Sequence, residues 1–136
     1  MKFFRKDKDG GPTSTVTGYW LFEIKRLFSV ALLKFEHGSR DEYHSHAFNS
    51  ISWLLKGELL EQSLYCWKKK HFPSFFPIIT TRSNFHRVYS NGTTWVLTFR
   101  GPWAKQWQEY DPGTKTYTTL EHGRVVANTI KVEMRQ

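Results

Sequence analysis

Two histidines stand one residue apart in the stretch GSRDEYHSHAF, at His44 and His46. In a strand, residues two apart share a face, so both rings would point the same way and Ser45 the opposite way. Imidazole nitrogens bind metals such as iron, nickel and zinc. A site also needs a third donor from elsewhere in the chain, and His86, at the start of a later strand-like segment, is the candidate. The residues predict a three-histidine metal site, and the alternative of two surface histidines on a strand stays open.

Two arginines lie near this predicted centre in the sequence. Arg82 precedes His86 by four residues, and Arg100 ends the strand that follows. A guanidinium group could bind a carboxylate or phosphate of a substrate through paired hydrogen bonds. The alternative for each is a solvated loop arginine. The remaining histidines lie close to glycine or proline and are expected in loops: His37, His71 and His122.

The first element expected to position these residues is YWLFEIKRLFSVALLKFEHG. Its apolar residues fit one face of a helix, and they also fit the alternation of strands. We predict two strands bent near Lys25-Arg26, because the rest of the chain has the pattern of strands.

Two hairpins are predicted further along the chain. The first has strands at 47–55 and 58–67 and turns at Lys56-Gly57. The second is FHRVYSNGTTWVLTFRG, in which Asn91-Gly92 can adopt the positive φ angles of a tight turn. The segment HFPSFFPII holds two prolines and is expected to be a loop or a sheet edge.

Many short strands separated by turn signals predict an all-β sandwich or small barrel. One helical turn is expected in GPWAKQW, where Trp103 and Trp107 have i, i+4 spacing and would cover the end of the barrel. The 136 residues suit a single domain. We divide it into an N-terminal arm at 1–18, a barrel at 19–126 and a tail at 127–136.

Composition sets the expected location and partners. The sequence has no run of about 18 apolar residues, so no membrane span is predicted. The start of the chain lacks the apolar core of a secretion signal. The single cysteine, Cys66, excludes an internal disulfide and suits a reducing cytoplasm. The net charge of +8 favours an anionic partner, although it could serve solubility alone. Because the basic residues are spread along the chain, a small anionic molecule or nucleotide is expected rather than nucleic acid.

The first histidine stretch resembles the first motif of the cupin superfamily: a glycine, five residues, His-x-His, a carboxylate and a later glycine. Gly38, His44, His46 and Gly57 occupy the glycine and histidine positions. Ser50 stands at the carboxylate position, which departs from the pattern.

The second cupin motif offers one histidine, and His86 matches it, although Thr81 and Ser83 stand where proline and glycine are preferred. The resemblance implies a jelly-roll fold. It also implies a metal ion held by three histidines and, in many members, one glutamate. We predict that the site here stays neutral and open, and the alternative is that Glu61 or Glu42 replaces the missing acid.

A narrower resemblance covers nearly the whole chain, including TFRGPWAKQWQEY and HGRVV. It is to small cupin-like proteins of tailed bacteriophages. This implies a phage origin and the host cytoplasm as location, but no reaction.

The sequence therefore predicts a cupin with a divalent metal on His44, His46 and His86. If it is an enzyme, the cupin resemblance implies Fe2+-dependent oxygenation of a small anionic molecule, because cysteine dioxygenase-like cupins use a three-histidine site. Zn2+, Ni2+ and Mn2+ are the other candidate metals. Two alternatives stay open: a non-catalytic protein that sequesters a host nucleotide signal, and a metal-free scaffold. A homodimer is expected from the resemblance alone.

Overall fold

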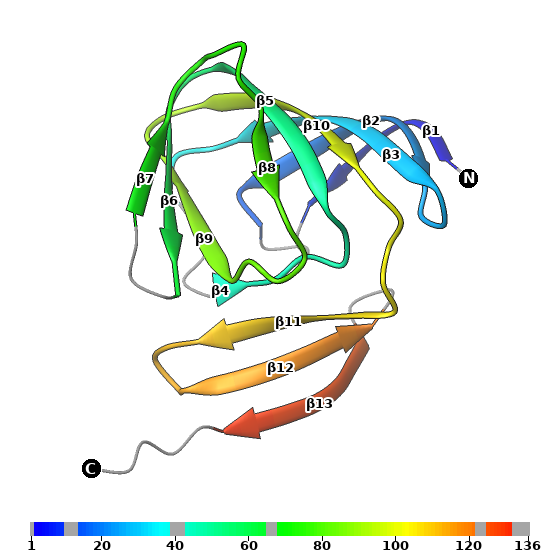
Figure 1. The fold of residues 1–136 in the computed structure, drawn as a ribbon, viewed down its shortest axis with the longest axis vertical. Helices are drawn as coiled ribbons and strands as arrows, with labels where there is room; N and C mark the ends of the chain where they lie inside the picture. The colour runs from blue at the N-terminus through cyan, green and yellow to red at the C-terminus, as the bar shows by residue number, and fades with distance from the viewer. Residues whose placement is uncertain (1, 10–13, 39–42, 65–67, 122–124, 132–136) are drawn as a thin grey trace.

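The computed structural model describes residues 2–9, 14–38, 43–64, 68–121 and 125–131. These residues form strands, turns and loops without a helix, so the all-β prediction is confirmed, and no helix that could cross a membrane occurs among them. The strands, labelled in Figure 1, are β1 (Lys2–Lys8), β2 (Val16–Ile24), β3 (Phe28–Phe35), β4 (Tyr43–His44), β5 (Ser50–Lys56), β6 (Leu59–Ser63), β7 (Lys68–His71), β8 (Ile78–Thr80), β9 (His86–Ser90), β10 (Thr94–Arg100), β11 (Gln106–Asp111), β12 (Thr116–Glu121) and β13 (Val125–Lys131).

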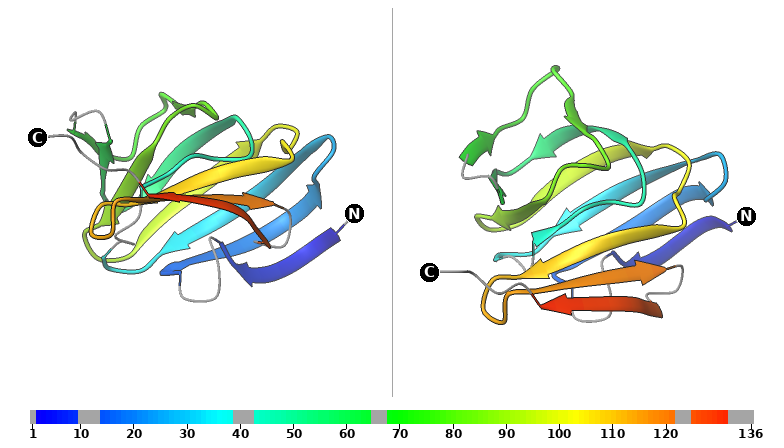
Figure 2. Two further views of the ribbon diagram at one scale, coloured as in Figure 1. Left: turned by 90° about the horizontal axis from the view of Figure 1, so that it is seen from below. Right: turned by 60° about the horizontal axis from the view of Figure 1, so that its bottom comes forward.

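The strands form two antiparallel sheets. One has the order β1-β2-β3-β10-β5-β8, and the other has the order β13-β12-β11-β4-β9-β6-β7. Figure 2 shows β11, β12 and β13 side by side, extending the second sheet beneath the first. Burial alternates along the inner strands, as in β10, where every second residue from Thr94 to Arg100 is buried. The apolar core comes from the inner faces of both sheets: Trp20, Ala31, Leu33, Leu54, Leu59 and Val96.

Both predicted hairpins are wrong, because their strands belong to different sheets. β5 and β10 lie in the first sheet, whereas β6 and β9 lie in the second. Gly57 and Gly92 do have positive φ angles, of 100° and 80°, but they turn the chain from one sheet to the other. A turn signal indicates a change of direction and does not say which strand becomes the neighbour.

The two corners pack against each other. The Asn91 N–H donates to the Glu58 carbonyl at 3.3 Å, and Thr94 Oγ1 accepts from the Glu58 N–H at 3.1 Å. A Cβ on Gly57 would lie 2.5 Å from Thr94 Oγ1 and 2.7 Å from the Thr93 carbonyl oxygen. Glycine is required there by both the backbone angle and the close approach.

Other local predictions had mixed outcomes. The two strands around Lys25-Arg26 are confirmed as the paired strands β2 and β3. The proline-rich segment is a loop at 72–77 between β7 and β8, which are both end strands of their sheets. The helical turn near Trp107 is wrong, because this residue lies in β11 and pairs with Leu120 of β12. Residues of the expected arm and tail form β1 and β13, and the division of the chain stays a prediction.

Candidate metal centre

The fold brings the three predicted histidines together by strand pairing. His44 ends β4 and is the partner of His86, the first residue of β9. The strand around the His-x-His pair is shorter than predicted, because His46 lies beyond the end of β4. The hydroxyl of the intervening Ser45 accepts a hydrogen bond from the Gln108 N–H at 3.0 Å. This bond fixes the irregular segment against β11.

The geometry of the cluster suits a metal ion. The three ring centroids lie 4.8 to 5.0 Å apart, and the ligand atoms all lie within 4.8 Å of one another. Nε2 of His46 lies 2.9 Å from Nε2 of His86. Metal–nitrogen bonds of about 2.1 Å at a right angle place two donors ~3 Å apart. His86 is buried, His44 and His46 are half-buried, and all three line a cavity of about 680 Å³ between the sheets.

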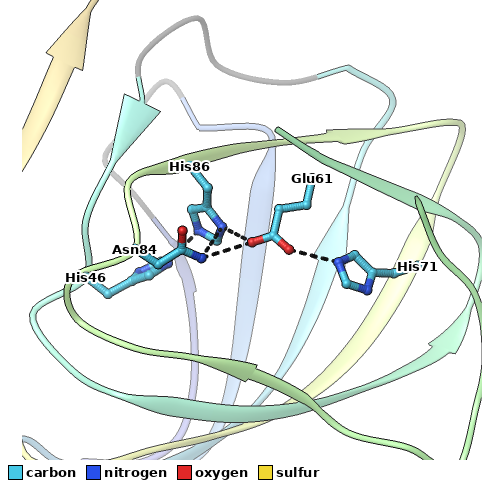
Figure 3. A network of polar contacts seen from close by, with 5 residues as sticks. All are labelled: His46, Glu61, His71, Asn84 and His86. Carbon is cyan, nitrogen blue, oxygen red and sulfur yellow. Dashed lines mark hydrogen bonds and ion pairs between the residues drawn. The ribbon is translucent and has the colours of Figure 1, made fainter. Parts of the chain in front are cut away.

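Glu61, on β6, lies on the other side of the His86 ring. Its Oε2 accepts hydrogen bonds from His86 Nδ1 and, at 3.1 Å, from Asn84 Nδ2. Its Oε1 accepts from His71 Nε2 at 2.9 Å (Figure 3). Glu61 therefore contacts the nitrogen of His86 that points away from His46. Its role as a direct metal ligand stays a prediction.

Glu61 is ionised in this environment. Its burial would raise the pKa of the carboxyl group, but the hydrogen bonds from His71 and His86, with their positive charge when protonated, outweigh burial and hold the pKa well below its usual range. An ionised carboxylate can only accept, so Nδ1 of His86 carries the hydrogen in this contact. In neutral His86, Nε2 then presents its lone pair to the cluster.

Two residues of this network were missed by the sequence analysis. His71 is not a loop residue, because it ends β7 and its side chain is only 10% exposed. Asn84 precedes β9 by two residues. The signal that could have found them is the alternation of β6, where Glu61 shares the buried face with Leu59 and Ser63. A buried acid needs nearby donors.

Arg100 lines the same cavity, and the ring of Phe48 lies between its guanidinium group and His46. Its guanidinium carbon lies 4.5 Å from the centroid of Phe48, whose ring is 5.2 Å from that of His46. Trp20 covers the guanidinium at 4.9 Å, and both terminal nitrogens donate to Asp9, at 3.2 and 2.6 Å. The predicted anion-binding group thus already holds a carboxylate of the chain.

The other predicted site residues are more widely placed. Arg82 is exposed, and its backbone N–H donates to Asn49 Oδ1 at 2.9 Å; it lines a second, more open hollow that also reaches His46. Ser50, at the position of the cupin acid, is buried in the cavity wall. Glu42 lies outside the described residues. Anion binding by either arginine stays a prediction.

The chain resembles solved structures in fold while no protein-family model and no curated protein matches it. A sugar phosphate isomerase from a cupin superfamily, from Silicibacter pomeroyi, aligns with a TM-score of 0.59 and 12% identity over 86% of this chain and 76% of that one. A cupin superfamily protein of Desulfitobacterium hafniense gives 0.54 and 18%, over 64% and 77% of the two chains. Ectoine synthase from P. lautus gives 0.56 and 14%, over 66% of each. The phage origin stays a prediction. With its two antiparallel sheets and these neighbours, the chain has the jelly-roll fold of the cupin superfamily.

Proposed function

We propose that this protein binds a divalent metal ion through His44, His46 and His86 and a small anionic molecule in the adjoining cavity. The observation that carries the proposal is the convergence of three imidazoles from two distant segments, with two Nε2 atoms 2.9 Å apart. Two nitrogens at this distance share one hydrogen in the absence of a metal or bind one ion together.

The donor set suits iron, zinc or nickel, because all three ligands are imidazoles. Fe2+ in such a site would supply oxygen activation, and oxygenation is the enzyme chemistry to test first. The chain itself would position the reactants. Phe48, Trp103 and Trp107 line the cavity and restrict water near the histidines.

Arg100 is the proposed anchor for the anionic group of the ligand. Its burial between Trp20 and Phe48 strengthens its interaction with an anion, since a charge pair is screened less away from water. The ligand would replace the Asp9 carboxylate. A sugar phosphate is the first ligand to test, because it carries the required charge and because the similar protein of S. pomeroyi is a sugar phosphate isomerase.

A second candidate is metal-independent proton transfer. The contact of ionised Glu61 with His86 is the kind of carboxylate–imidazole pair that acts as a general base in enzymes. Metal content separates the two candidates. The alternative of nucleotide sequestration would be favoured by a nucleotide extracted from protein that holds no metal.

The test is elemental analysis of the protein expressed without an affinity tag, followed by zinc titration. We expect about one divalent ion per chain, lost on treatment with a chelator. Protein that is folded and takes up no Zn2+, Fe2+ or Ni2+ would contradict the proposal.

A further inference from the structure

Glu61 is a buried charge that the proposed metal binding does not use directly. We infer that Glu61 is a positioning residue for His86, holding its ring in the Nδ1–H form with Nε2 aimed at the metal. Through this ring it also provides the negative charge that Ser50 does not supply. The inference rests on the proposed metal site, and Glu61 would help to set the affinity of that site for a metal ion.

The first step is the order of the groups in space. The carboxylate contacts Nδ1 of His86, and Nε2 of the same ring faces His46 at 2.9 Å. The imidazole of His86 therefore lies between the negative charge of Glu61 and His46, as Figure 3 shows. A carboxylate that accepts from one ring nitrogen fixes the tautomer and makes the other nitrogen a stronger ligand.

The second step is how Glu61 is itself held. His71 donates to Oε1 and Asn84 donates to Oε2, so each oxygen has a donor in addition to the contact with His86. Glu61 is only 5% exposed, and a carboxylate buried without donors is strongly unfavourable. His71 is therefore a second positioning residue, which acts on the cluster through Glu61.

A purely structural role is the competing explanation, since the network joins β6, β7 and β9. That role predicts that substitutions lower stability and leave the metal affinity of the folded protein unchanged. The two explanations are separated by the tautomer of His86 and by metal affinity, and neither measurement depends on catalysis.

The first measurement is the nitrogen-15 NMR spectrum of the histidine rings in the metal-free wild-type protein. We expect the Nδ1–H tautomer for His86. His37 is an internal reference with the opposite expectation, because its Nδ1 accepts from the Gly92 N–H at 3.0 Å. An Nε2–H tautomer for His86 would overturn the inference whether or not the protein binds metal.

The second measurement is Zn2+ affinity by chelator competition in folded variants. Loss of an outer partner of a ligand lowers metal affinity by roughly 10–100-fold. We expect the lower end for Glu61→Gln, which keeps an acceptor and loses the charge, and the upper end for Glu61→Leu. Glu58→Gln is the matched control, since Glu58 is partly exposed and lies 3.8 Å from Lys70; its affinity should equal that of the wild type.

His71 gives a test by rescue. His71→Leu removes the donor to Glu61 and should weaken Zn2+ binding, whereas His71→Gln keeps an N–H donor and should restore much of it. Wild-type affinity in both Glu61 variants would show that the network is structural. If Glu61→Leu does not fold, Glu61→Gln and the wild-type tautomer decide. Equal Zn2+ binding by wild type and His46→Ala would instead refute the proposed metal site, and the tautomer would still test the role of Glu61.

Discussion

Two of the buried charges that line the cavity, Glu61 and Arg100, have partners that differ in kind. Glu61 is held by His71, His86 and an amide, and the imidazole beside it keeps a second nitrogen for another partner. Arg100 is held by Asp9 through two parallel hydrogen bonds, and the pair balances its own charge. In the first arrangement, a cation would replace the one hydrogen that Nε2 of His86 and Nε2 of His46 share at 2.9 Å. The second can bind an anion only by exchanging its partner.

The largest expected effect concerns the histidine end of the cavity. His46→Ala removes a proposed ligand, so its loss of metal affinity should exceed the roughly 10–100-fold typical of an outer partner. Elemental analysis and chelator competition measure it. His37→Ala, outside the cluster, is the control. Equal metal content in His46→Ala and His37→Ala would show that the histidine cluster is not a cation site.

Asp9→Asn tests the ion pair between Asp9 and Arg100. The substitution leaves the buried guanidinium without its charged partner and should cost about 1–3 kcal/mol of unfolding free energy. Urea denaturation measures it.

The control for Asp9 is Asp7→Asn in the same part of the chain. Asp7 is more than half exposed and pairs with Arg5 at 3.1 Å, so the cost should be below about 1 kcal/mol. Added phosphate should stabilise Asp9→Asn more than the wild type. No response to phosphate would argue that Arg100 and Asp9 form a structural pair alone.

Ser50→Glu should have opposite effects on the binding of a cation at the histidines and of an anion at Arg100. A carboxylate that reached the histidines should raise Zn2+ affinity by about tenfold, which corresponds to ~1.4 kcal/mol. It should also weaken the binding of a sugar phosphate by repulsion. Ser50→Gln is the uncharged control, and equal affinities in the two variants would mean that the charge already supplied by Glu61 suffices.

The smallest expected effect is the dependence of stability on pH. The pKa of Glu61 is lowered on folding, so its ionised form contributes stability above the ordinary glutamate pKa of about 4.3. This contribution is lost as the pH falls from there through the lower pKa of the folded state. The stability difference between wild type and Glu61→Gln should therefore shrink in strong acid, as measured by urea denaturation from pH 6 downwards. A difference that stays constant at low pH would show that the charge of Glu61 has no part in stability.

The sequence allowed the three histidines to be assembled because two of them share a motif and the third matches a second motif. It could not reveal the partner of Glu61, since His71 reaches it only after β7 pairs with β6 in a particular register. It also could not assign strands to sheets. Gly57 and Gly92 were recognised as turn residues from the sequence. That β6 pairs with β9 depends on which side chains are buried on the inner faces of the two sheets, and a turn signal does not contain this information.

The pairing of β4 with β9 has a mechanical consequence. In the described residues, β4 joins β11 to β9 within the second sheet, and its pairing with β9 is the single residue pair His44 and His86. These are two of the three proposed ligands. An ion bound there would link β4 to β9, so that the force needed to pull β11, β12 and β13 away from the rest of the sheet would rise with metal occupancy.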